Sequence, residues 1–67
     1  MSKELKEIKA MIKTRLIELD MKQYELAQSV NVSSTVISEL LSYGKGSDIV
    51  KQNVATVLGI ENPWEKF

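Results

Sequence analysis

The sequence predicts an all-α fold, a compact bundle of four to five helices in one domain that spans residues 1–67. Apolar residues recur at three- and four-residue intervals along most of the chain, which is the period of helices that bury one face. No segment alternates apolar and polar residues as a half-buried strand does. A chain of 67 residues has room for one small core and no second domain.

The composition excludes several kinds of site. Cysteine and histidine are both absent, so the chain lacks the ligands of a thiolate metal site, a catalytic thiol and a histidine base. The acidic residues form no converging pair that the pattern can place, and the glycines form no nucleotide-binding loop. We therefore expect no enzymatic activity, no cofactor and no small-molecule ligand.

Hydropathy and charge indicate where the protein acts. The apolar runs are far too short to cross a bilayer, and the first residues, MSKELKEIK, lack the apolar region of a signal peptide. We expect a cytoplasmic protein with no membrane partner. Nine basic and nine acidic residues give a net charge of zero. This sum argues against a nucleic-acid partner, although the local placement of charge matters more.

The first two helices follow from the spacing of apolar residues. In the first helix, the residues of one face are Leu5, Ile8, Ile12, Leu16 and Leu19. The second helix is shorter and ends near Ser29 or Val30. Its apolar side carries Leu26, Ala27 and Val30. Asn31 breaks the pattern, and because asparagine adopts the left-handed conformation more easily than most residues, we expect a tight turn there.

Two further helices and a last turn are predicted after Asn31. Ser33 is a good N-cap for a third helix whose apolar residues are Val36, Ile37, Leu40 and Leu41. Ser47 or Asp48 can cap a fourth helix that ends at Gly59. Its inward residues are expected to be Ile49, Val50, Val54, Val57 and Leu58. A last turn is expected with Asn62 as cap, Pro63 at the first helical position and Glu65 reaching back.

The order of these elements is that of a helix-turn-helix domain, in which two short helices are joined by a turn of about three residues. The segment MKQYELAQSVNVSSTVISELLSYGKG resembles the Cro and phage-repressor-type helix-turn-helix family. The matching residues are Gln23, Leu26, Ala27, Val32, Ser33, Ile37, Ser38, Leu40 and Lys45. The resemblance implies a lambda-repressor-like DNA-binding domain with its helix-turn-helix unit at about residues 22–42.

The same resemblance implies a function. It predicts a sequence-specific transcriptional regulator of phage or bacterial type, which reads double-stranded operator DNA in the major groove with the helix that starts at Ser33. The residues expected to read bases are Ser34, Thr35, Ser38 and Glu39. Those expected to bind phosphate are Lys22, Gln23, Ser33, Tyr43 and Lys45. The regulator is expected to act as a homodimer or with a partner regulator.

The chain departs from the family pattern in three ways. Lys22 stands where the family usually has a Thr or Ser cap, a loss worth about 1 kcal/mol. Asn31 replaces the glycine of the turn. Leu16 and Leu41 stand at the positions of a buried Arg–Glu pair, and such an exchange for apolar residues is often neutral or stabilising. We expect both leucines to be buried and to touch between the first and third helices.

Each residue of the predicted site also has a plainer interpretation. Short polar residues can simply cover an exposed surface near a cap. Glu39 is repelled by phosphates unless it finds a base donor. Lys22, Lys45 and Lys51 either bind phosphate or are ordinary solvated lysines. Tyr24 and Tyr43 either reach phosphate through their hydroxyls or pack by their rings.

Two questions each have two possible answers, namely the role of the C-terminal aromatic residues and the overall function. Trp64 either closes the core against the first helix or forms a two-fold interface with Phe67. The alternative function is a helix-turn-helix protein-interaction module, such as an antirepressor that binds a repressor. The zero net charge and Glu39 on the reading face favour this alternative.

Overall fold

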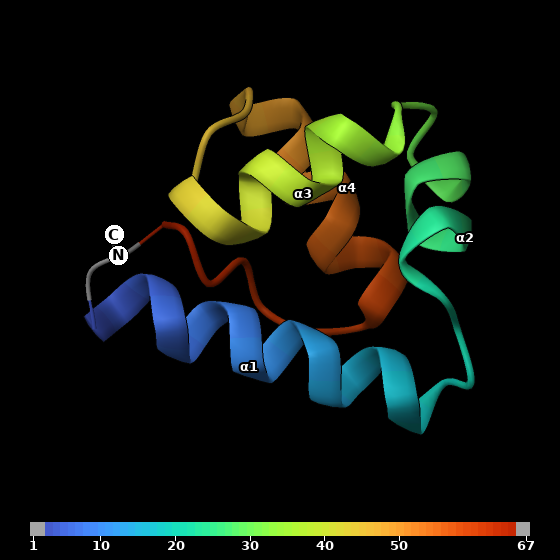
Figure 1. Ribbon diagram of the computed structural model, residues 1–67, viewed down its shortest axis with the longest axis horizontal. Coiled ribbons are helices and arrows are strands. Elements are labelled where there is room, and N and C mark those ends of the chain that lie inside the picture. The colour runs from blue at the N-terminus through green and yellow to red at the C-terminus, as the bar shows by residue number, and fades with distance from the viewer. Residues whose placement is uncertain (1–2, 66–67) are drawn as a thin grey trace.

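The computed structural model describes residues 3–65, and within this range it contains four α-helices and no strand. The helices are α1 (Lys3–Glu18), α2 (Gln23–Ser29), α3 (Ser34–Tyr43) and α4 (Asp48–Leu58). Helices α1 and α3 pack side by side, α2 packs at one end of α3, and α4 lies behind them (Figure 1). The chain after Gly59 returns along α1. The all-helical prediction is confirmed.

One hydrophobic core joins all four helices. It contains residues from every helix together with Trp64 from the C-terminal segment. Leu16 on α1 and Leu41 on α3 are 6% and 2% exposed, and both belong to this core. The prediction that both leucines are buried is therefore confirmed.

Two residues predicted to face inward are exposed. Leu19 is 39% exposed because α1 ends at Glu18, so the residue lies in the turn beyond the helix. Ile49 is 73% exposed. It lies five residues before the buried Val54, which is about 1.4 helical turns, so the two side chains leave α4 on different sides. The other predicted inward residues of α4 are buried or half-buried, namely Val50, Val54, Val57 and Leu58.

All four helices end with a residue in the left-handed conformation, and the three such residues after α1, α2 and α4 share one hydrogen-bond pattern. These residues are Asp20 with φ 53°, Asn31 with φ 60° and Gly59 with φ 68°. In each case the next residue's N–H donates to a carbonyl five residues earlier, for example Val32 N to Ala27 O at 2.9 Å, which is the Schellman arrangement. The predictions for Asn31 and Gly59 are confirmed. Asp20, which was not predicted, has the same role at the end of α1.

The predicted caps are confirmed, whereas the last helical turn is not. Ser33 Oγ accepts from Val36 N–H at 3.3 Å and Ser47 Oγ from Val50 N–H at 3.2 Å. Asn62 Oδ1 accepts from Trp64 N–H at 2.9 Å. Residues 63–65 form a turn instead of a helix. The one backbone bond that closes there, from Glu65 N to Asn62 O at 3.4 Å, spans only three residues.

Candidate nucleic-acid interface

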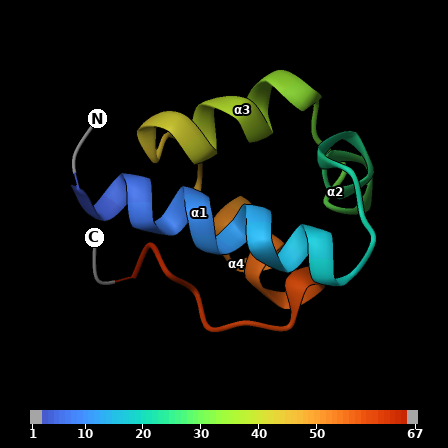
Figure 2. The ribbon, with the colours of Figure 1, turned by 60° about the horizontal axis from the view of Figure 1, so that its bottom comes forward.

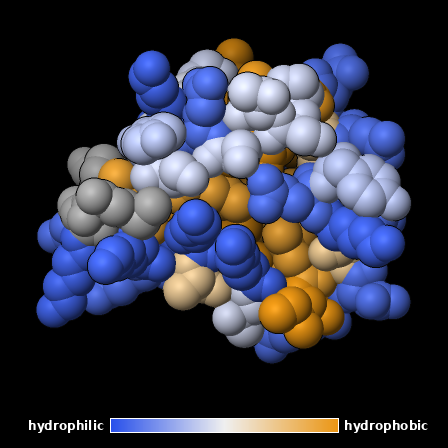
Figure 3. Space-filling model, viewed as in Figure 1, coloured by the Kyte–Doolittle hydropathy of each residue, from blue (hydrophilic) through white to orange (hydrophobic). Residues whose placement is uncertain are grey.

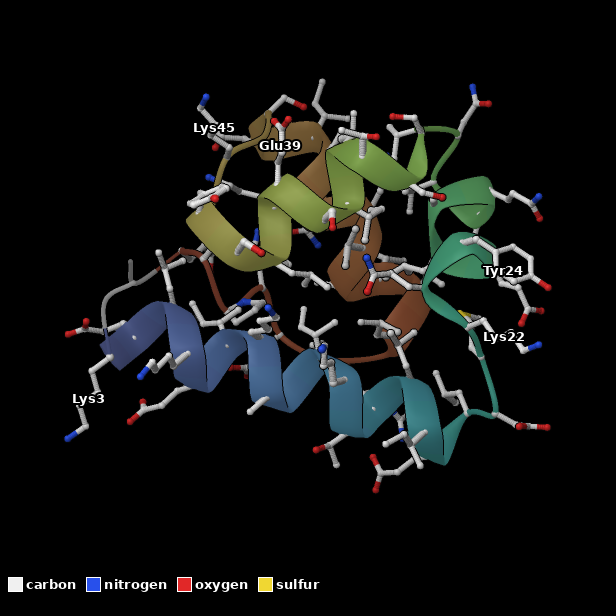
Figure 4. The ribbon with its side chains drawn as sticks, viewed as in Figure 1. Lys3, Lys22, Tyr24, Glu39 and Lys45 are labelled. Atoms are coloured by element: carbon white, nitrogen blue, oxygen red, sulfur yellow. The ribbon has the colours of Figure 1, made fainter. Side chains whose placement is uncertain are left out.

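Helix α3 separates its polar and apolar residues onto two sides. Ile37, Leu40 and Leu41 are buried. The four residues predicted to read bases, Ser34, Thr35, Ser38 and Glu39, are all exposed. Figure 4 shows Glu39 projecting away from the body of the protein, and Figure 3 shows a pale, moderately polar surface over α3. The structure therefore brings these four residues together on one outer face of one helix.

Ser33 stands at the start of this face and has two hydrogen-bonding functions available. Its oxygen accepts from the Val36 N–H at 3.3 Å, which caps α3. A hydroxyl group can also donate one hydrogen bond, and Ser33 is exposed. The hydroxyl can thus cap the helix and donate to an external acceptor at the same time.

A first group of predicted phosphate-binding residues lies at the start of α2. Lys22 is exposed, and its Nζ lies 5.9 Å from the centre of the Tyr24 ring, a cation–π distance. Tyr24 is 51% exposed, so its ring covers little of the core. Gln23 is the first residue of α2 and is half-buried.

Glu25 is the residue of this region whose role the sequence did not predict. Its Oε1 accepts from the Lys22 N–H at 3.0 Å, which is half of a capping box. Lysine has no acceptor, so the other half is missing. The spacing of Lys22 and Glu25 was the available signal. The Glu25 carboxylate places a negative charge at the N-terminus of α2, which is unfavourable for a second anion at that position.

A second group lies at the other end of α3. Tyr43 is the last residue of α3 and is 68% exposed. Gly44 ends the helix with φ 68°, and the exposed Lys45 follows. A Cβ on Gly46 would lie 3.3 Å from Leu40 Cδ1, so this loop passes close to the core. Figure 4 shows Lys45 near one end of α3 and Lys22 beyond the other, with Glu39 between them.

Trp64 belongs to the core. It is 5% exposed, so the core interpretation is confirmed, and the ring offers almost no surface to a second copy of the chain. Its Nε1 is buried and has no hydrogen-bond partner among residues 3–65. Phe67, the other residue of the predicted dimer contact, lies outside the described residues.

A pocket of about 450 Å³ lies between the first turns of α4 and the C-terminal segment. It is lined by Asp48, Lys51, Gln52, Asn62, Trp64 and Glu65. Because Trp64 Nε1 has no exposed surface, this donor does not open into the pocket. Lys51 lines this pocket together with residues of the C-terminal segment.

The described residues show no metal site and no membrane-spanning helix, and no known protein matches the chain. Within residues 3–65, no group of three or more acidic, histidine or cysteine residues is placed to hold a metal ion. None of the four described helices has the length and apolar character needed to cross a bilayer. Comparison with protein-family models, curated proteins and solved structures finds nothing that matches this chain.

Proposed function

We propose that this protein is a sequence-specific transcriptional regulator of phage or bacterial type that binds double-stranded operator DNA through a helix-turn-helix unit. In this proposal α2 and α3 are the two helices of the unit, residues 30–33 connect them, and α3 enters the major groove. The proposal includes no catalytic step, cofactor, metal or small-molecule ligand.

One observation carries the proposal. The outer face of α3 is an exposed row of short hydroxyl residues and one carboxylate, while its inner face is fixed in the core. Hydroxyls can donate to or accept from either kind of base pair, and the Thr35 methyl can contact a thymine methyl. Glu39 can accept from cytosine N4. A face of this kind suits base edges because its side chains are short and its backbone is held rigidly.

The two groups at the ends of α3 supply the phosphate contacts. Lys22 and Gln23 lie beyond one end, and Tyr43 and Lys45 at the other. Ser33 adds a hydroxyl donor at the start of the reading helix. Contacts of this kind fix the register of the protein on the duplex, whereas the base contacts select the sequence.

A protein-interaction module, such as an antirepressor that binds a repressor, is the second candidate. Residues 22–45 carry two lysines and two glutamates, so the proposed DNA-binding unit has no net positive charge. Glu39 is exposed in the middle of its outer face. A neutral face with a carboxylate at its centre also suits a protein partner.

Selection from random double-stranded DNA, at low and at physiological salt, separates these candidates. Enrichment of a palindromic motif supports a regulator that acts as a homodimer, and a single motif supports one that acts with a partner regulator. Absence of any enrichment at both salt concentrations contradicts the proposal and favours the interaction module. Affinities must be compared at stated salt because phosphate contacts depend on it.

A further inference from the structure

The lysines of α1 form a row on one flank of the helix. Lys6, Lys9 and Lys13 follow one another at intervals of three and four residues. At 3.6 residues per turn they fall within an arc of about 60°. Lys6 and Lys13 are exposed and Lys9 is half-buried. We call these three residues the lysine row.

The lysine row lies on the α3 side of α1. Arg15 projects from the other flank of the buried stripe, and its Nε donates to Leu58 O at the end of α4 at 2.7 Å. That bond fixes which flank of α1 faces α4 and the C-terminal segment. Figure 2 shows α3 along one side of α1 and the chain after Gly59 along the other. The row is therefore turned towards α3, on the flank opposite Arg15.

No ion pair within residues 3–65 neutralises the positive charge of the row. Among residues 3–65, the only ion pair joins Arg15 Nη1 to Glu18 Oε1 at 3.6 Å, on the opposite flank. Of the eight charged residues of α1, five are basic and three acidic, which gives a surplus of two positive charges. The segment 22–45 has no surplus of positive charge, since its two lysines are matched by two glutamates. The surplus of positive charge that favours duplex DNA is thus on α1, whereas the lysines of the proposed reading unit are balanced by its glutamates.

The geometry of the major groove indicates which part of the DNA the lysine row would contact. The groove is about 12 Å wide, and a helix with its side chains is about 10–12 Å across. When α3 fills the groove, a helix packed beside it lies over the groove edge, where the phosphates are. Figure 3 shows hydrophilic side chains near α1 and the pale α3 surface on the same face of the molecule.

We propose that the lysine row binds the phosphate backbone of the same DNA duplex that α3 reads. This inference rests on the proposed function. The row spans about 10 Å along α1, which is less than one turn of DNA of about 34 Å, so it meets a single stretch of one strand. It supplies affinity for any sequence, while the choice of sequence stays with α3.

The test compares the full chain with the triple variant Lys6→Gln, Lys9→Gln, Lys13→Gln on a random-sequence duplex and on the selected motif. Glutamine is a good helix former, and circular dichroism checks that helicity is kept. We expect binding to weaken severalfold on both duplexes, with an unchanged preference between them. The slope of log K against log salt should fall by about one to two units, at about 0.9 per phosphate.

Two control variants locate the effect. The exchange Lys6→Glu with Glu7→Lys keeps the net charge and moves one positive charge off the row, so it should weaken binding. Lys51→Gln removes a lysine beside the C-terminal segment and should leave the slope unchanged.

If the full chain binds DNA and the triple variant keeps its slope, the row is a solvated face or meets a protein, and this inference alone is overturned. If the full chain binds no DNA, the proposed function falls together with it.

Discussion

Helices α1 and α3 pack side by side with similar inner faces and different outer ones. Both bury aliphatic residues in the shared core. Outward, α3 carries hydroxyls, one carboxylate and no lysine or arginine, whereas α1 carries four lysines. In the proposed function this contrast separates two tasks that many DNA-binding helices combine. We propose that α3 selects the sequence, and that the lysines of α1 add to the attraction for any duplex.

The largest effect should come from breaking the core that fixes the two outer faces relative to one another. Leu41→Ala removes a side chain that is 2% exposed and should cost about 2–5 kcal/mol, enough to unfold a small domain. Urea denaturation followed by circular dichroism measures this cost. Leu41→Met keeps the volume and should cost less than about 1.5 kcal/mol. A small loss in the alanine variant would mean that α1 and α3 are not held together here.

A smaller effect is expected from changing the chemistry of the α3 face alone. Glu39→Gln exchanges an acceptor suited to cytosine for an amide suited to adenine. The preference at one base pair should change by about 1–3 kcal/mol, while affinity for random DNA rises because a negative charge is lost. Competition binding with variant duplexes measures both effects.

Glu61→Gln is the matched control for Glu39→Gln. Glu61 is exposed in the segment after α4, so the variant removes the same charge away from α3. It should leave the base preference unchanged. If both variants shift the preference equally, Glu39 acts by its charge alone and contacts no base.

Lys22→Thr sharpens the comparison at the start of α2. Threonine completes the capping box that Glu25 half fills, and the domain should be stabilised by about 1 kcal/mol. Loss of the lysine should weaken binding about equally on specific and random DNA and lower the salt slope by about 0.9. Thermal unfolding and salt titration measure the two effects. Lys22→Met separates them, since it removes the charge without adding an acceptor.

The smallest effect is expected at Trp64. Trp64→Phe removes a buried donor that lacks a partner, and this gain offsets part of the lost packing. The net change in the free energy of unfolding should stay within about 1 kcal/mol, against about 3–5 kcal/mol for Trp64→Ala. DNA binding should not change, because Trp64 contributes to neither outer face. A large loss in the phenylalanine variant would show that the indole N–H has a partner in solution.

Much of the fold followed from the sequence because its signals are local. Ser33, Ser47, Asn31 and Gly59 act within one turn of their own position, so a short stretch of sequence is enough to predict them. The predictions that Leu19 and Ile49 face inward were wrong for a related reason. The apolar period identifies a helix but does not say where it ends or which of its residues the other helices cover.

The candidate site was less accessible to sequence reasoning. Exposure of the α3 face follows from the helical period alone, once the apolar side is known. Which neighbouring element the lysine row faces is known only from the bond between Arg15 and Leu58, which are 43 residues apart. The sequence does not distinguish between a core and an interface position for Trp64, because no local pattern states what covers an aromatic ring.

The buried indole gives the protein an optical probe of its own. Trp64 is the single tryptophan, and it lies in the core, away from the outer faces of α1 and α3. Its fluorescence should shift to longer wavelengths when the chain unfolds and water reaches the ring. Binding of DNA to α3 should leave that emission in place, so one instrument can follow folding and a labelled duplex independently in the same cuvette.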